Sequence, residues 1–106
     1  MKIVWMKNAK RQLDEIHDFL AGQSPTAAVK FYNGLIDEVE RLADFPEMAP
    51  VEALLISRPE RFRSLVVMKT YKVIYFIDNR AVNVVTVWDC RQNPTKLCEG
   101  VLKEKK

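Results

Sequence analysis

Apolar residues recur at helical spacing in two stretches of the first half of the chain. The first stripe consists of Ala9, Leu13, Ile16 and Leu20, and the second of Ala28, Phe31, Leu35, Val39 and Leu42. Steps of three and four residues are the period of an amphipathic helix. The sequence therefore predicts one helix that follows a cap at Asn8 and stops at Gly22. It predicts a second helix that begins at Ser24-Pro25, with serine as the cap and proline in the first turn, and runs to about Ala43.

The second half of the chain changes to the two-residue alternation of β-strands. Three such runs follow one another, at Phe62–Lys69, Tyr71–Asp78 and Ala81–Asp89, and the gaps between them are short enough for hairpins. A fourth apolar run, Lys2–Met6, has strand composition at the start of the chain. The intervening stretch Phe45–Pro59 holds three prolines, so it is predicted as a loop with at most one helical turn around residues 51–55.

This order of elements predicts an α+β fold in a single domain that spans residues 1–106. Two helices joined by a short turn form an antiparallel hairpin, which packs on one face of a twisted antiparallel sheet in the order β-α-α-β-β-β. The N-terminal strand joins that sheet to bury its apolar side chains. Asn93-Pro94 resembles the start of a short C-terminal helix, anchored by Leu97 and Val101.

Composition narrows the classes of function. The chain is 48% hydrophobic and 29% charged, which is typical of a globular protein, and it has neither a membrane-length apolar run nor a secretory signal. We therefore expect a cytoplasmic protein without membrane contact. Its two cysteines and its single histidine, His17, fit no common zinc spacing, so we expect no metal and no cofactor.

Positive charge is concentrated in the C-terminal half. Residues 1–50 hold 6 Lys/Arg and 8 Asp/Glu, whereas residues 51–106 hold 11 and 6. Three of these cations, Arg63, Lys72 and Arg91, lie on or just after the predicted strands and would bind phosphate if they converged on one face of the sheet. The other residues proposed to bind a nucleic acid or a protein target are Arg61, Lys69, Tyr71 and Trp88. The alternative is a solvated basic face with the aromatic rings in the core.

Four segments together resemble the RelE/ParE superfamily, the toxins of type II toxin–antitoxin modules, which include plasmid stabilisation proteins. They are Ser24–Phe31 (SPTAAVKF), Leu42–Pro46 (LADFP), Tyr71–Ile77 (YKVIYFI) and Val87–Pro94 (VWDCRQNP). The resemblance extends over nearly the whole chain. It implies a growth-inhibiting toxin that a cognate antitoxin neutralises by wrapping around it, in a hetero-oligomer.

The resemblance implies one of two mechanisms. RelE-like members cut mRNA on the ribosome without a metal, using cations to hold the phosphate, a base and an acid. ParE-like members inhibit DNA gyrase and need no nuclease site. The family's nuclease cations fall on Arg63, Lys72 and Arg91, but a further cation falls on Leu65, and the C-terminal tyrosine of some nucleases falls near Leu97.

The groups needed for proton transfer are therefore not evident, with Asp89 and Glu60 as the remaining candidate bases. The long helical hairpin favours the ParE-like mechanism slightly. The sequence is also compatible with a non-toxic binding module, or with a degenerate toxin kept as a decoy for an antitoxin. An apolar groove for the antitoxin is expected near Trp5, Ile16 and Phe19.

Overall fold

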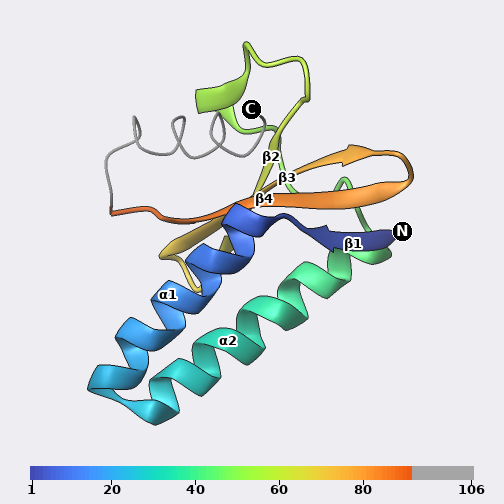
Figure 1. Ribbon diagram of the computed structural model, residues 1–106. Helices are drawn as coiled ribbons and strands as arrows, with labels where there is room; N and C mark the ends of the chain where they lie inside the picture. Colours follow the sequence, from blue (N-terminus) through green and yellow to red (C-terminus); the bar gives the residue numbers. More distant parts are fainter. Residues whose placement is uncertain (92–106) are drawn as a thin grey trace.

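The fold consists of a four-stranded sheet with a helical hairpin on one face (Figure 1). The computed structural model describes residues 1–91, so the predicted helix after Asn93-Pro94 lies outside the described residues. The elements in chain order are β1 (Lys2–Trp5), α1 (Lys7–Gln23), α2 (Pro25–Glu40), the short 3-10 helices η1 (Arg41–Ala43) and η2 (Ala53–Leu55), β2 (Arg63–Val67), β3 (Tyr71–Asp78) and β4 (Ala81–Asp89). The predicted α+β class and order of elements are confirmed.

The sheet is mixed, whereas the sequence predicted an antiparallel one. Its strand order is β1-β4-β3-β2, and β1 runs parallel to β4 with Lys2 opposite Ala81 and Trp5 opposite Val84. The other two pairings, β2 with β3 and β3 with β4, are antiparallel as predicted. An alternating pattern specifies which side chains are buried but not the direction of a strand, and the direction of β1 depends on a partner almost eighty residues away.

The boundary between the two helices is set by Pro25 rather than by Gly22. Gly22 lies inside α1, and neither glycine in residues 1–91 has a positive φ, so the predicted left-handed stop at Gly22 is wrong. The chain leaves the helical conformation at Ser24, where φ is −158°, because a proline disfavours helical geometry in the residue before it. Ser24 Oγ then accepts a hydrogen bond from the Ala27 amide at 3.2 Å and caps α2, as predicted.

The N-terminus of α1 also differs from the prediction. The helix begins at Lys7 after Met6, so Asn8 lies in its first turn and is not its cap. Asn8 is buried, and its Oδ1 accepts a hydrogen bond from Arg11 Nη2 at 2.5 Å. The backbone of Met6 continues the contact of β1 with the sheet, with its amide 2.9 Å from the Val84 carbonyl, and this contact fixes where the helix can start.

Both hairpin turns use residues with positive φ. Asn79 and Arg80, at 53° and 58°, form the two-residue connection between β3 and β4, which is the geometry of a type I′ turn. Met68 and Lys69, at 54° and 61°, turn the chain between β2 and β3. Because these two residues belong to the turn, β2 is shorter than the predicted strand Phe62–Lys69.

The two faces of the sheet carry separate apolar clusters. The cluster beneath the helices contains Leu35, Tyr75 and Val84, all with 0% exposure. The cluster on the opposite face contains Phe62, Ile74 and Val85, also fully buried. The sheet is therefore covered on both sides, by the hairpin on one and by the loop that carries η2 on the other.

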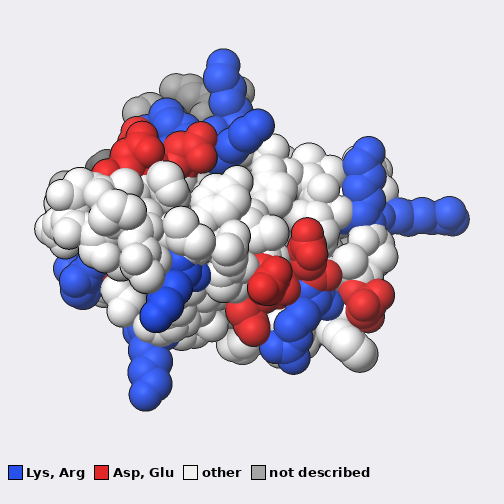
Figure 2. All heavy atoms as spheres, turned by 90° about the horizontal axis from the view of Figure 1, so that it is seen from below, with Lys and Arg blue, Asp and Glu red and all other residues white. Residues whose placement is uncertain are grey.

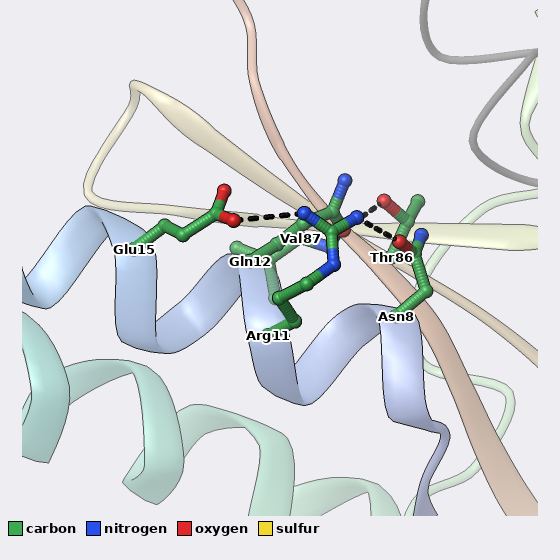
Figure 3. A network of polar contacts seen from close by, with 6 residues as sticks. All are labelled: Asn8, Arg11, Gln12, Glu15, Thr86 and Val87. Carbon is green, nitrogen blue, oxygen red and sulfur yellow. Dashed lines mark hydrogen bonds and ion pairs between the residues drawn. The ribbon is translucent and has the colours of Figure 1, made fainter.

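Gln12 joins α1 to the end of β4 (Figure 3). Beyond Val84, the outer edge of β4 no longer has β1 as a partner, and a register shift occurs between Ile74 and Tyr75 of the neighbouring β3. Here Gln12 Oε1 accepts hydrogen bonds from the Val87 amide, at 3.0 Å, and from the Thr86 hydroxyl. The side chain satisfies two groups that are buried between helix and strand.

We expect Gln12→Ala to lower the free energy of unfolding by about 1–3 kcal/mol, because it leaves the Val87 amide and the Thr86 hydroxyl without an acceptor. Urea denaturation measures the change. Gln23→Ala, at the exposed end of α1, is the matched control and should have an effect within about 0.5 kcal/mol. Equal stability of the two variants would show that Gln12 does not carry this junction.

Candidate functional site

Arg63, the first proposed phosphate ligand, holds the loop before β2. It lies opposite Tyr75 in the sheet register, on the face covered by the helices. Its Nη1 donates to the Ala49 carbonyl at 2.7 Å, and the Tyr75 hydroxyl donates to the Pro46 carbonyl at 2.7 Å. Burial raises the pKa of Tyr75. These two side chains fasten residues 46–49 to the sheet.

Lys72, the second proposed ligand, lies on the other face. Its neighbours in the alternation, Ile74 and Phe76, belong to the cluster away from the helices. Its Nζ is 2.6 Å from Glu52 Oε1, and the Glu52 side chain is only 4% exposed. Glu52 Oε2 also accepts from the Leu54 amide at 3.0 Å. Burial works to raise the pKa of Glu52, but the hydrogen bonds and the charge of Lys72 outweigh it and leave that pKa below its ordinary value.

Arg91, the third proposed ligand, forms a two-point ion pair with Asp89. Nε and Nη2 of the guanidinium are 3.0 and 2.7 Å from Oδ1 and Oδ2 of the carboxylate. The hydrogen bond from Arg91 lowers the pKa of Asp89. The Arg91 side chain is 73% exposed, so the charge pair lies at the surface after the end of β4.

The structure does not bring these three cations together. Lys72 and Arg63 project from opposite faces of the sheet. Arg63 pairs with Tyr75 in the sheet register, and Asp89 pairs with Tyr71. Arg63 and Asp89 are therefore separated by roughly 13 Å along the direction of β3. Each cation has a protein partner of its own, and two of the three partners are carboxylates.

The other candidate residues do not form one cluster, although Arg61 lines a hollow of about 620 Å³ together with Arg63 and the candidate base Glu60. Arg61 and Lys69 are exposed at the two ends of β2, both with positive φ. Tyr71 is 8% exposed and packs edge-on against Phe31, with the ring centroids 4.9 Å apart. Trp88 is 6% exposed in the cluster away from the helices. Both side chains therefore lie largely in the core, with only a small fraction of their surface exposed.

Each of the two candidate bases, Asp89 and Glu60, already forms an ion pair with an arginine. Asp89 is paired with Arg91, as described above. Glu60 Oε2 accepts from Arg58 Nη2 at 3.3 Å, and its Oε1 is buried with no hydrogen-bond partner among residues 1–91. His17 lies near Asp18, with 3.2 Å between Nδ1 and Oδ1, and its ring meets Tyr32 edge-on. This places His17 at the surface of the hairpin.

A trough lies between α1 and the end of β4, and the sequence predicted only some of the residues that line it. It consists of two adjoining hollows of about 380 and 120 Å³. Two residues expected to form an apolar groove, Ile16 and Phe19, line it. Its other wall is formed by residues of β3, β4 and the residues just after β4, which are Tyr71, Val87, Trp88, Asp89 and Arg91. Trp5 does not line either hollow.

A family model for the ParE toxin of the type II toxin–antitoxin system parDE matches residues 3–94. This chain belongs to the ParE toxin family. A solved structure, "Chromosomal ParDE TA system from P. aeruginosa", is similar to it with a TM-score of 0.70 and 16% sequence identity, over 84% of this chain and 95% of the other. At that identity the similarity supports the fold. No curated protein sequence matches the chain.

Three further observations concern this ParE-family toxin. Among the helices of residues 1–91, none is long and apolar enough to cross a bilayer. Within the same residues, histidine, cysteine and acidic side chains form no group of three that would hold a metal ion. Figure 2 shows the helical side of the molecule, where uncharged surface separates small groups of basic and acidic side chains. Among the residues that the structure describes, basic side chains form no continuous surface on that side of the kind that binds nucleic acid.

Proposed function

We propose that this ParE-family toxin arrests bacterial growth by binding and inhibiting DNA gyrase, and that it does not cut mRNA. The observation that carries the proposal is the dispersal of Arg63, Lys72 and Arg91 over both faces and both ends of the sheet. Inhibition of a protein target requires a surface that fits it, whereas phosphodiester cleavage requires several groups around one phosphate.

Metal-independent RNA cleavage needs cations on the phosphate oxygens, a base within hydrogen-bond distance of the 2′-hydroxyl and an acid at the leaving oxygen. In this protein Lys72 holds Glu52, and Arg63 holds the carbonyl of Ala49. A substrate would have to displace both contacts and then bridge the thickness of the sheet. The geometry therefore disfavours a RelE-like nuclease.

An antitoxin is the partner proposed for the free toxin, with which it forms a hetero-oligomer. Large apolar side chains are exposed at several places on the surface, among them Phe19 at 65%, Ile56 at 74% and Val66 at 55%. Exposed apolar residues of this size favour a protein partner that covers them. An antitoxin that covers the exposed apolar residues used to bind gyrase would block the toxin by competition.

Two assays on the purified full chain test the mechanism. We expect inhibition of DNA supercoiling by gyrase, and intact mRNA in a ribosome-dependent cleavage assay. In cells, induced expression should arrest growth with induction of the DNA-damage response. Cleaved mRNA with unaffected supercoiling would show a nuclease. The absence of growth arrest would identify a binding module or a decoy.

A further inference from the structure

Gly34 lies inside α2, where alanine would be the more favourable residue. An isolated glycine in a helix generally has a packing reason, because it lets another part of the chain approach the helix backbone closely. The structure shows such an approach, since a Cβ atom added at Gly34 would lie 2.7 Å from the Cε methyl group of Met68. Gly34 therefore leaves a notch in α2, and the end of the Met68 side chain lies in it.

Met68 belongs to the turn between β2 and β3, which reaches the helical hairpin at this notch (Figure 1). Met68 and Lys69 have φ values of 54° and 61°. The turn between β3 and β4 also has positive φ, at Asn79 and Arg80, but asparagine tolerates this conformation far better than methionine does. The β2–β3 turn therefore depends on tertiary support, and the contact of Met68 with Gly34 supplies it.

Met68 remains accessible to solvent. The residue is 46% exposed, although its terminal methyl group packs against α2. Peroxides oxidise exposed methionine to the sulfoxide. The thioether sulfur donates an electron pair to one peroxide oxygen, the O–O bond breaks, and the products are the sulfoxide and water. The sulfoxide is polar and carries an additional oxygen beside the methyl group, so it does not fit an apolar notch of this width.

We propose that Met68 is an oxidation-sensitive contact that holds the β2–β3 turn against α2, and that hydrogen peroxide releases the turn by converting Met68 to the sulfoxide. Oxidation expels the side chain from the notch at Gly34 and leaves Met68 and Lys69 in a strained backbone conformation without support. Enzymatic reduction of the sulfoxide restores the contact. This device belongs to the fold and is independent of the target that the toxin inhibits.

The test measures thermal unfolding of the full chain before and after peroxide treatment, with oxidation at each methionine quantified by mass spectrometry. We expect the melting temperature of the parent to fall by about 5 °C once Met68 is oxidised, and methionine sulfoxide reductase to restore it. Met68→Leu keeps an apolar side chain of similar volume without the sulfur, and its melting temperature should fall by less than about 1 °C. Met48→Leu is the matched control, because Met48 is 37% exposed in the loop before β2, and this variant should respond as the parent does.

Gly34→Ala distinguishes the notch from a general effect of methionine oxidation. The added methyl group fills the notch and displaces Met68, so the reduced and oxidised forms of this variant should melt within about 1 °C of each other. Hydrogen exchange gives a local readout, because oxidation should accelerate exchange about tenfold in the β2–β3 turn and leave the β3–β4 turn unchanged. The inference would be overturned by resistance of Met68 to peroxide, by an unchanged parent after its oxidation, or by equal losses in the parent and Gly34→Ala.

Discussion

Lys72→Met is expected to lower the free energy of unfolding by about 1–3 kcal/mol while leaving growth arrest intact. The substitution keeps the length of the side chain but leaves the Glu52 carboxylate, 4% exposed, without its cation. Denaturant unfolding measures the loss of stability. Lys30→Met, on the exposed side of α2, is the matched control and should change stability by less than about 0.5 kcal/mol.

The pH dependence of stability provides a second readout of the same ion pair. Because the pKa of Glu52 in the folded protein lies below its ordinary value of 4.5, the contribution of Glu52 to stability is present above that value. It is lost as the pH falls through the lowered pKa of the folded state. Glu52→Gln removes this titration, and Lys72→Met reduces the shift. Both variants should therefore lose less stability than the parent between about pH 5 and pH 3.

The double variant that combines Glu52→Gln with Lys72→Met distinguishes a structural role of Lys72 from phosphate binding. If Lys72 and Glu52 act as a pair that fastens the loop, the double variant will be more stable than the sum of the single effects predicts, by about 0.5 kcal/mol or more. If Lys72 is instead a phosphate ligand, Lys72→Met will abolish arrest, the stability effects will add, and mRNA cleavage will disappear. That result would revive the nuclease mechanism.

Leu35→Ala is expected to be the most destabilising of the substitutions considered, at about 2–5 kcal/mol. Leu35 is 0% exposed in the middle of α2 and belongs to the cluster between the hairpin and the sheet. Truncation removes apolar contacts and leaves a cavity that the packed strands beneath it cannot fill. A domain of this size typically has a stability of only about 5–15 kcal/mol, so the loss is a large fraction of the total.

Thermal unfolding measures the effect of Leu35→Ala, and we expect the melting temperature to fall by roughly 10 °C or more. Val29→Ala on the same helix is the control, because Val29 is 53% exposed and its truncation removes little buried area. A decrease of less than about 1 kcal/mol for Leu35→Ala would show that the hairpin packs on the sheet more loosely than the structure indicates.

The local elements could be predicted because their causes lie within a few residues of one another. The apolar stripe that includes Phe31 and Leu35 predicted α2 and its buried face, and both residues are in the core. Ser24-Pro25 marked the start of α2. The strand bounds Tyr71–Asp78 and Ala81–Asp89 agree with the structure residue for residue. The turn at Asn79-Arg80 was recognised from its length.

The candidate site could not be predicted in the same way, because its geometry depends on contacts between distant segments. The sequence placed Arg63, Lys72 and Arg91 on or after strands. It did not show that Lys72 forms an ion pair with Glu52, which lies twenty residues earlier in the chain. Only the Arg91–Asp89 pair, two residues apart, was within reach of local reasoning. Of the groove residues, Ile16 and Phe19 were identified from their apolar character, and Tyr71 and Asp89 were not placed opposite them.

The order of helices and strands, the buried stripe of each helix and the positions of the turns follow from periodicity, proline and the serine cap, which act through neighbouring backbone atoms. Tertiary structure alone decided that β1 runs parallel to β4, that the basic side chains are distributed over both faces, and that α1 keeps one face open beside Arg91. Those features depend on which distant surfaces pack together, and an alternating pattern leaves that choice open.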